Sequence, residues 1–81
     1  MSCNCRKSDP LDLNTVVVTC EDERGAWRKL IYLTRKAGQR TWSARIREQG
    51  SPLRPLPPVV DRDTNLNSLR NRVERRACGG R

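Results

Sequence analysis

Thr15-Val16-Val17-Val18-Thr19-Cys20 (TVVVTC) is the clearest structural signal in this chain. Five of its six residues carry β-branched side chains, which lose rotamer freedom in a helix and pack well on the pleated surface of a sheet. The stretch therefore predicts a strand. The rest of the fold depends on which other segments can pair with it.

Residues 27–34 (WRKLIYLT) are the first candidate partner, because the turn-forming residues 22–25 (DERG) separate them from this strand. Gly25 can adopt the left-handed backbone conformation that a bulged hairpin turn requires. The apolar residues of the segment also fall at the i, i+3, i+4 and i+7 spacing of a helix, and basic residues and a glycine follow it, as at a helix end. We prefer the second arm of a hairpin, with a helix as the alternative.

Residues 41–48 (TWSARIRE) alternate between apolar and polar side chains. Trp42, Ala44 and Ile46 fall on one face of an extended segment, whereas Arg45 and Arg47 fall on the other. This pattern predicts a half-buried strand. Together, the three segments predict a three-stranded antiparallel sheet within residues 15–50, preceded by an N-terminal arm over residues 1–14.

Residues 51–62 contain four prolines, which lack backbone donors and favour an extended polyproline conformation. We expect a Pro-rich strap here. Within it, residues 54–58 (RPLPP) resemble the Arg-x-Leu-Pro-Pro-x-Pro ligands of Src-homology type-3 domains, and they depart from that pattern at Val60, where the last proline would stand. The resemblance implies that Arg54 would pair with an acidic pocket on such a domain. The alternative is a plain connector.

Residues 63–81 predict a basic helix. Asp63 or Thr64 can cap its start, and two glycines, Gly79 and Gly80, can end it. Its apolar residues form one stripe that would cover the sheet. The expected fold is therefore a single small α+β domain, with a three-stranded antiparallel sheet, a Pro-rich extended connector and one C-terminal helix whose stripe is Leu66, Leu69, Val73 and Ala77.

The charge of the chain indicates the kind of partner. It has 17 Lys and Arg residues against 9 Asp and Glu, a net charge of +8, and 14 of the cations are Arg. A guanidinium pairs with phosphate and carboxylate alike, so the composition favours an anionic partner. The alternative is a solvated basic surface. The candidate partner-binding residues are Arg45 and Arg47 on the sheet, Arg54 in the strap, and Arg70, Arg72, Arg75 and Arg76 on the helix.

Two classes of function fit these residues, and neither is enzymatic. The chain has no His that could activate a Cys nucleophile, and we expect no small-molecule substrate. The first class is an interaction protein that docks on a larger assembly with an acidic surface; residues 1–6 (MSCNCR) resemble the start of small tailed-phage proteins, which implies a virion accessory role as capsid cement or connector. The second class is a nucleic-acid-binding regulator that uses the Arg-rich sheet or helix.

Cys3, Cys5, Cys20 and Cys78 have three possible states. Zinc needs soft donors that converge tetrahedrally, although a Cys-x-Cys pair with two isolated Cys differs from the paired knuckles of zinc ribbons. Disulfides are the second state and unconnected thiols the third. No segment has the features of a secretory signal or a membrane span, so we expect a cytoplasmic or virion-associated protein that binds no membrane, in a compartment that disfavours disulfides.

Overall fold

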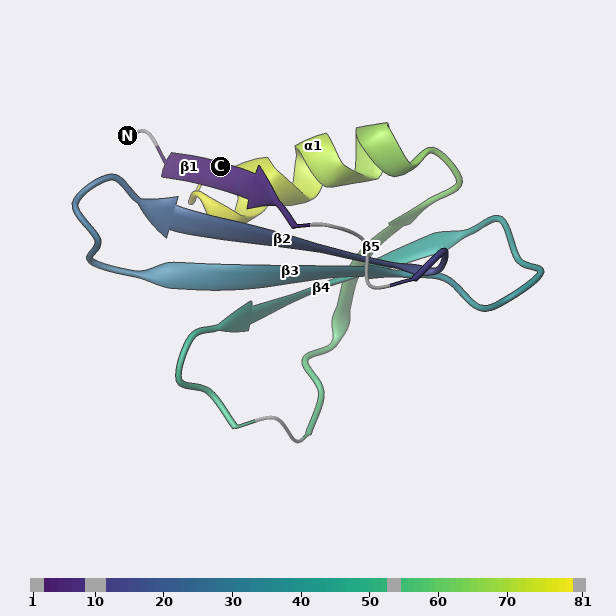
Figure 1. Ribbon diagram of the computed structural model, residues 1–81, viewed down its shortest axis with the longest axis horizontal. Coiled ribbons are helices and arrows are strands. Elements are labelled where there is room, and N and C mark those ends of the chain that lie inside the picture. Colours follow the sequence, from purple (N-terminus) through teal and green to yellow (C-terminus); the bar gives the residue numbers. More distant parts are fainter. Residues whose placement is uncertain (1–2, 9–11, 53–54, 80–81) are drawn as a thin grey trace.

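The computed structural model describes residues 3–8, 12–52 and 55–79. They form a five-stranded antiparallel sheet whose strands lie in sequence order, followed by one helix (Figure 1). Each strand therefore pairs with its neighbours along the chain. The elements are β1 (Cys3–Lys7), β2 (Thr15–Asp22), β3 (Arg28–Thr34), β4 (Trp42–Glu48), β5 (Val59–Asp63) and α1 (Leu66–Ala77).

The α+β class is confirmed, but the prediction of a three-stranded sheet is wrong. The additional strands are β1, inside the expected N-terminal arm, and β5, which crosses the expected boundary between the strap and the helix. β1 has a polar sequence and gains its conformation by pairing with β2 along its whole length. β5 begins directly after Pro58, where backbone N–H donors return to the chain and can pair with β4.

The hairpin interpretation of residues 27–34 is confirmed. β3 pairs antiparallel with β2, so the helical alternative for this segment is wrong. Gly25 has a φ of 73°, a left-handed conformation that costs glycine least. Its N–H donates to the Asp22 carbonyl over 2.8 Å and closes the turn.

The core lies between α1 and one face of the sheet. The expected helical stripe is confirmed, because Leu69, Val73 and Ala77 are buried and Leu66 packs against them. The alternation in β4 is confirmed as well: Trp42 and Ala44 are buried, and Ile46 is partly buried against the core. The remaining buried apolar side chains come from β2 and β3, namely Val16, Val18, Cys20, Ile31 and Leu33.

The helix starts and ends at defined caps. Asn65, rather than the expected Asp63 or Thr64, is the N-cap, and its side-chain oxygen accepts from the Ser68 N–H over 3.1 Å. Asp63 instead ends β5 and accepts the Asn65 N–H over 2.9 Å. Gly79, at a φ of 78°, follows the C-cap Cys78. Among the described residues, no helix is both long and apolar enough to cross a membrane.

Replacing Trp42 with Ala should lower the free energy of unfolding by about 3 to 5 kcal/mol, because the indole is lost from a small core. Trp42 is only 6% exposed, and the Arg35 guanidinium lies 4.7 Å from its ring centre. Urea denaturation followed by circular dichroism measures the loss. Trp27→Ala is the matched control and should cost less, because Trp27 is half-buried. Equal stability of Trp42→Ala and the wild type would contradict the core as described.

Candidate docking surface and cysteine cluster

The face of the sheet opposite α1 carries the predicted sheet arginines. Arg45 and Arg47 alternate with the core residues of β4, and they lie opposite Tyr32 and Leu30 of β3. The Arg47 guanidinium lies 5.8 Å from the centre of the Tyr32 ring. Arg45 donates to the Pro57 carbonyl and so attaches the Pro-rich strap to this outer face. The strand alternation thus brings both predicted residues to one surface.

A cavity of about 480 Å³ opens on the outer face, near the turn that joins β3 to β4. Four cations line it: Arg35 and Lys36 from the turn, Arg45 from β4 and Arg62 from β5. The other lining groups among the described residues are neutral and include the hydroxyls of Thr34, Thr41 and Ser43. No carboxylate of the described chain lines this cavity, so its electrostatic potential favours an anion.

Internal bonds hold two of these four cations in place. Arg35 donates through Nε to the Asn14 side chain over 3.1 Å and through a terminal nitrogen to the Leu13 carbonyl over 3.3 Å. Arg45 is held by its bond to Pro57. Lys36 and Arg62 are exposed, and they form no ion pair with any described residue. Their charges are therefore available to a partner.

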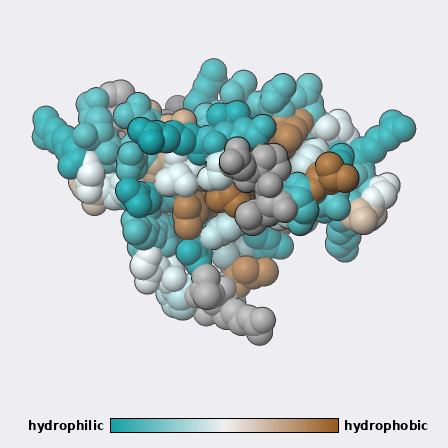
Figure 2. Space-filling model, viewed as in Figure 1, coloured by the Kyte–Doolittle hydropathy of each residue, from teal (hydrophilic) through white to brown (hydrophobic). Residues whose placement is uncertain are grey.

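Two leucines in the segments bonded to Arg35 and Arg45 are exposed to solvent. Leu13 is 86% exposed and Leu56 is 68% exposed. The first is bonded through its carbonyl to Arg35, and the second directly precedes Pro57, which is bonded to Arg45. In Figure 2 the surface is largely hydrophilic with a few separate hydrophobic areas. We call the set Leu13, Arg35, Lys36, Arg45, Leu56 and Arg62 the docking surface.

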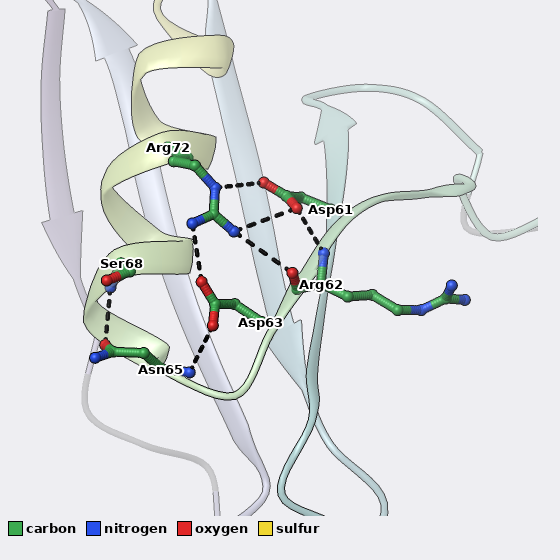
Figure 3. Close-up of polar contacts among 6 residues, drawn as sticks. All are labelled: Asp61, Arg62, Asp63, Asn65, Ser68 and Arg72. Atoms are coloured by element: carbon green, nitrogen blue, oxygen red, sulfur yellow. Dashed lines mark hydrogen bonds and ion pairs between the residues drawn. The ribbon is translucent and has the colours of Figure 1, made fainter.

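The helix arginines divide into two groups. Arg70 pairs with Glu74 one helical turn away, over 2.6 Å. Arg72 lies between two carboxylates of β5, with nitrogen–oxygen distances of 2.9 Å to Asp61 and 2.8 Å to Asp63 (Figure 3). These two arginines therefore make internal contacts and attach or stabilise the helix.

Arg75 and Arg76, in contrast, are exposed and form no ion pair within the described chain. Arg54 lies outside the described residues. Of the four predicted helix arginines, only this pair thus keeps its charges available at the surface.

The Arg72 network changes the acidity of both aspartates. The hydrogen bond from Arg72 is the main cause that lowers the pKa of Asp61, whereas the backbone N–H of Asn65 is the main cause that lowers the pKa of Asp63, with Arg72 second. The two carboxylates in turn raise the pKa of Arg72. Because the groups are solvent-exposed, we expect the network to orient the helix more than it stabilises the fold.

The four cysteines meet where the end of α1 reaches β1. Cys3 and Cys5 lie on the same face of β1, and Cys20 of β2 lies directly opposite Cys5. The structure pairs Cys3 with Cys78 and Cys5 with Cys20. The Sγ atom of Cys5 is also 3.8 Å from that of Cys78 and 4.0 Å from that of Cys3. The structure thus brings the four predicted cysteines together as two disulfides, and these are the residues that could hold a metal.

Sequence reasoning missed Arg35, Lys36 and Arg62 as site residues. The first two lie in a turn, and their role depends on the strands on either side. Arg62 faces the cavity because it pairs with Ser43 across β4 and β5, and β5 was not expected. Only the register of the sheet could have identified this set.

Replacing Arg72 with Gln should raise the pKa of Asp61 more than that of Asp63, because only Asp61 depends mainly on Arg72. A carboxyl group whose pKa is lowered in the folded state stabilises the fold at pH values above its unfolded pKa, which is near 3.8. This contribution is lost as the pH falls through the folded pKa. The variant should therefore lose less stability than the wild type on acidification below about pH 4. Carboxyl NMR titration measures both shifts, and Arg75→Gln is the control. Equal shifts of the two aspartates would contradict the network.

Comparisons with protein-family models, with curated proteins and with solved structures found no significant match to this chain. The function must therefore be inferred from the docking surface and the cysteine cluster. The first offers guanidinium, ammonium and hydroxyl donors, together with two exposed apolar side chains on the segments bonded to Arg35 and Arg45. The second offers four sulfur atoms at one point of the fold.

Proposed function

We propose that this protein is a non-catalytic binding protein that docks on the acidic protein surface of a larger assembly. The observation that carries the proposal is the docking surface: a cavity lined by four cations and by no carboxylate of the described chain, with an exposed leucine in each of the segments bonded to Arg35 and Arg45. The phage-type virion suggested by residues 1–6 is one assembly of this kind.

Both the charges and the leucines support a protein as the partner. Arginine is enriched in protein interfaces and pairs with carboxylates through two parallel hydrogen bonds. Leu13 and Leu56 would add apolar contact with a protein partner. Such contact would contribute little to the binding of a sugar-phosphate backbone, whose contacts are mainly polar. An acidic protein surface that also carries apolar side chains could contact both the cations and the leucines of the docking surface.

The fixed cations should contribute differently from the free ones. Arg35 and Arg45 are already held by internal bonds, so little conformational entropy is lost when an anion binds them. Lys36 and Arg62 extend into solvent, where their charges attract an acidic partner over a distance set by the salt concentration. We expect the fixed pair to set the binding position and the free pair to increase the association rate.

Nucleic-acid binding is the second candidate, and the hydroxyls of the cavity favour it. Thr34, Thr41 and Ser43 lie among the cations, and hydroxyl groups commonly donate to phosphate oxygens. In this case the two leucines would make little contact with the partner. Substitution of the leucines therefore separates the two candidates.

The double variant Lys36→Gln/Arg62→Gln should lose the protein partner, with affinity lowered at least about tenfold. Arg75→Gln/Arg76→Gln removes the same charge from the helix and should keep the partner. Leu13→Ser/Leu56→Ser should also weaken docking. Each variant is immobilised on a resin and incubated with a nuclease-treated extract of the native source, and the retained proteins are identified by mass spectrometry. The affinity of each variant for the purified partner is then measured.

Free DNA and RNA form the other arm of the experiment. If nucleic acid is the partner, binding should fall steeply with salt, and the salt slope should decrease by roughly one unit for each phosphate contact removed. The leucine variant would then bind as the wild type does. That outcome would replace the first candidate with the second. Retention of both partners by Lys36→Gln/Arg62→Gln would contradict any role of the cavity.

A further inference from the structure

We propose that the four cysteines, in their reduced form, bind one zinc ion as a tetrathiolate site. Cys3 and Cys5 of β1, Cys20 of β2 and Cys78 at the end of α1 would be the ligands. The proposal depends on the positions of the sulfur atoms and is independent of the proposed docking function.

The distances between sulfurs of different pairs fit such a site. A tetrahedral zinc ion with Zn–S bonds of about 2.3 Å places its sulfur ligands about 3.8 Å apart. The Sγ atom of Cys5 lies 3.8 Å from that of Cys78 and 4.0 Å from that of Cys3. The sulfurs of Cys3, Cys5 and Cys78 all lie within 4.8 Å of one another, and Cys20 is paired with Cys5. Three sulfurs thus lie at distances that suit a shared zinc ion, and Cys20 joins them through its neighbour Cys5.

Strand register, burial and a helix cap position these residues. The β1–β2 register places Cys5 opposite Cys20, and Cys3 is two residues away on the same face of the strand. Cys20 is completely buried in the core. Cys78 is the helix C-cap, and its N–H donates to the Glu74 carbonyl over 3.0 Å. A site formed by rigid elements binds metal with little loss of conformational freedom.

A positive charge lies beside the cluster. Lys29 of β3 is opposite Cys20 in the sheet. Its ammonium donates over 3.0 Å to the carbonyl of Ala77, the residue before Cys78. Four thiolates and one zinc ion carry a net charge of −2, which a neighbouring cation stabilises, and a cation also favours the thiolate over the thiol. Lys29 would thus offset part of the negative charge of a tetrathiolate zinc site.

Zinc and the two disulfides are alternative states of the same sulfur atoms. A thiol reductant such as glutathione supplies four electrons and four protons to the two disulfides, and it becomes oxidised to its own disulfide. The four thiols then bind Zn²⁺ as thiolates and release four protons. Metal binding is therefore possible only where a thiol reductant keeps these cysteines reduced.

The full chain, reduced with dithiothreitol and stripped of metal without oxygen, is titrated with Co²⁺ and then with Zn²⁺. We expect one ion per chain, the charge-transfer and visible bands of tetrahedral thiolate cobalt, and protection of all four thiols from alkylation when zinc is bound. Cys3→Ser and Cys78→Ser should each weaken zinc binding at least about tenfold, since a lost ligand costs no less than a lost second-shell partner. Thr19→Ser, a neighbour of Cys20 in β2, is the control.

Three results would overturn the proposal. The first is that the reduced wild type binds no metal, and the second is that cobalt binds without thiolate bands. The third is that Cys3→Ser and Cys78→Ser bind zinc as tightly as Thr19→Ser does. If the serine variants fail to fold, the cobalt spectrum of the wild type alone decides. A reduced chain that unfolds without metal and refolds when zinc is added supports the site, because zinc binding then supplies folding free energy.

Discussion

The packing of α1 against one face of the sheet determines where the core, the charged face and the cysteine cluster of this protein lie. One helix can cover only one face of a sheet, and a domain this small builds a single core. Leu69, Val73 and Ala77 meet the inner sides of the central strands, where Ile31 and Leu33 have no exposed surface. The buried apolar side chains of β2, β3 and β4 all lie on that side. The other face is left to half-exposed and charged side chains, and this is the reason why the arginines of β4 lie at a surface.

The position of the helix on the sheet also explains the other two clusters. α1 starts directly after β5 and ends beside β1, so it crosses the sheet from one edge to the other (Figure 1). Arg72 attaches the middle of the helix to β5 through Asp61 and Asp63. At its other end, the Lys29 ammonium binds the Ala77 carbonyl, where the helix dipole favours a positive charge. The cysteines lie at this same corner because the helix ends there.

The sequence predicts the parts of the fold that have strong local periodicity. The β-branched residues of β2, the alternation in β4 and the stripe of α1 each bury one face, so their patterns follow from local rules. Local patterns do not predict β1 and β5, because each is a short edge strand of mostly polar residues. Their extended conformation depends on pairing with the edge of a neighbouring strand. Asn65 was missed as the cap because Asp63, two residues earlier, satisfies the same preference in the sequence while belonging to a strand.

The candidate sites depend even more on tertiary arrangement. Cys5 and Cys78 are far apart in the sequence, and no spacing rule connects them. Net charge was equally incomplete as a guide, because it counts Arg72, whose charge two carboxylates of the same chain already balance. It gives the same weight to Arg62, which has no such partner among the described residues. What a partner meets is the charge that remains after internal pairing, and strand register decides where it lies. In this chain part of that charge lies near the β3–β4 turn, because β5 places Arg62 beside Ser43 there.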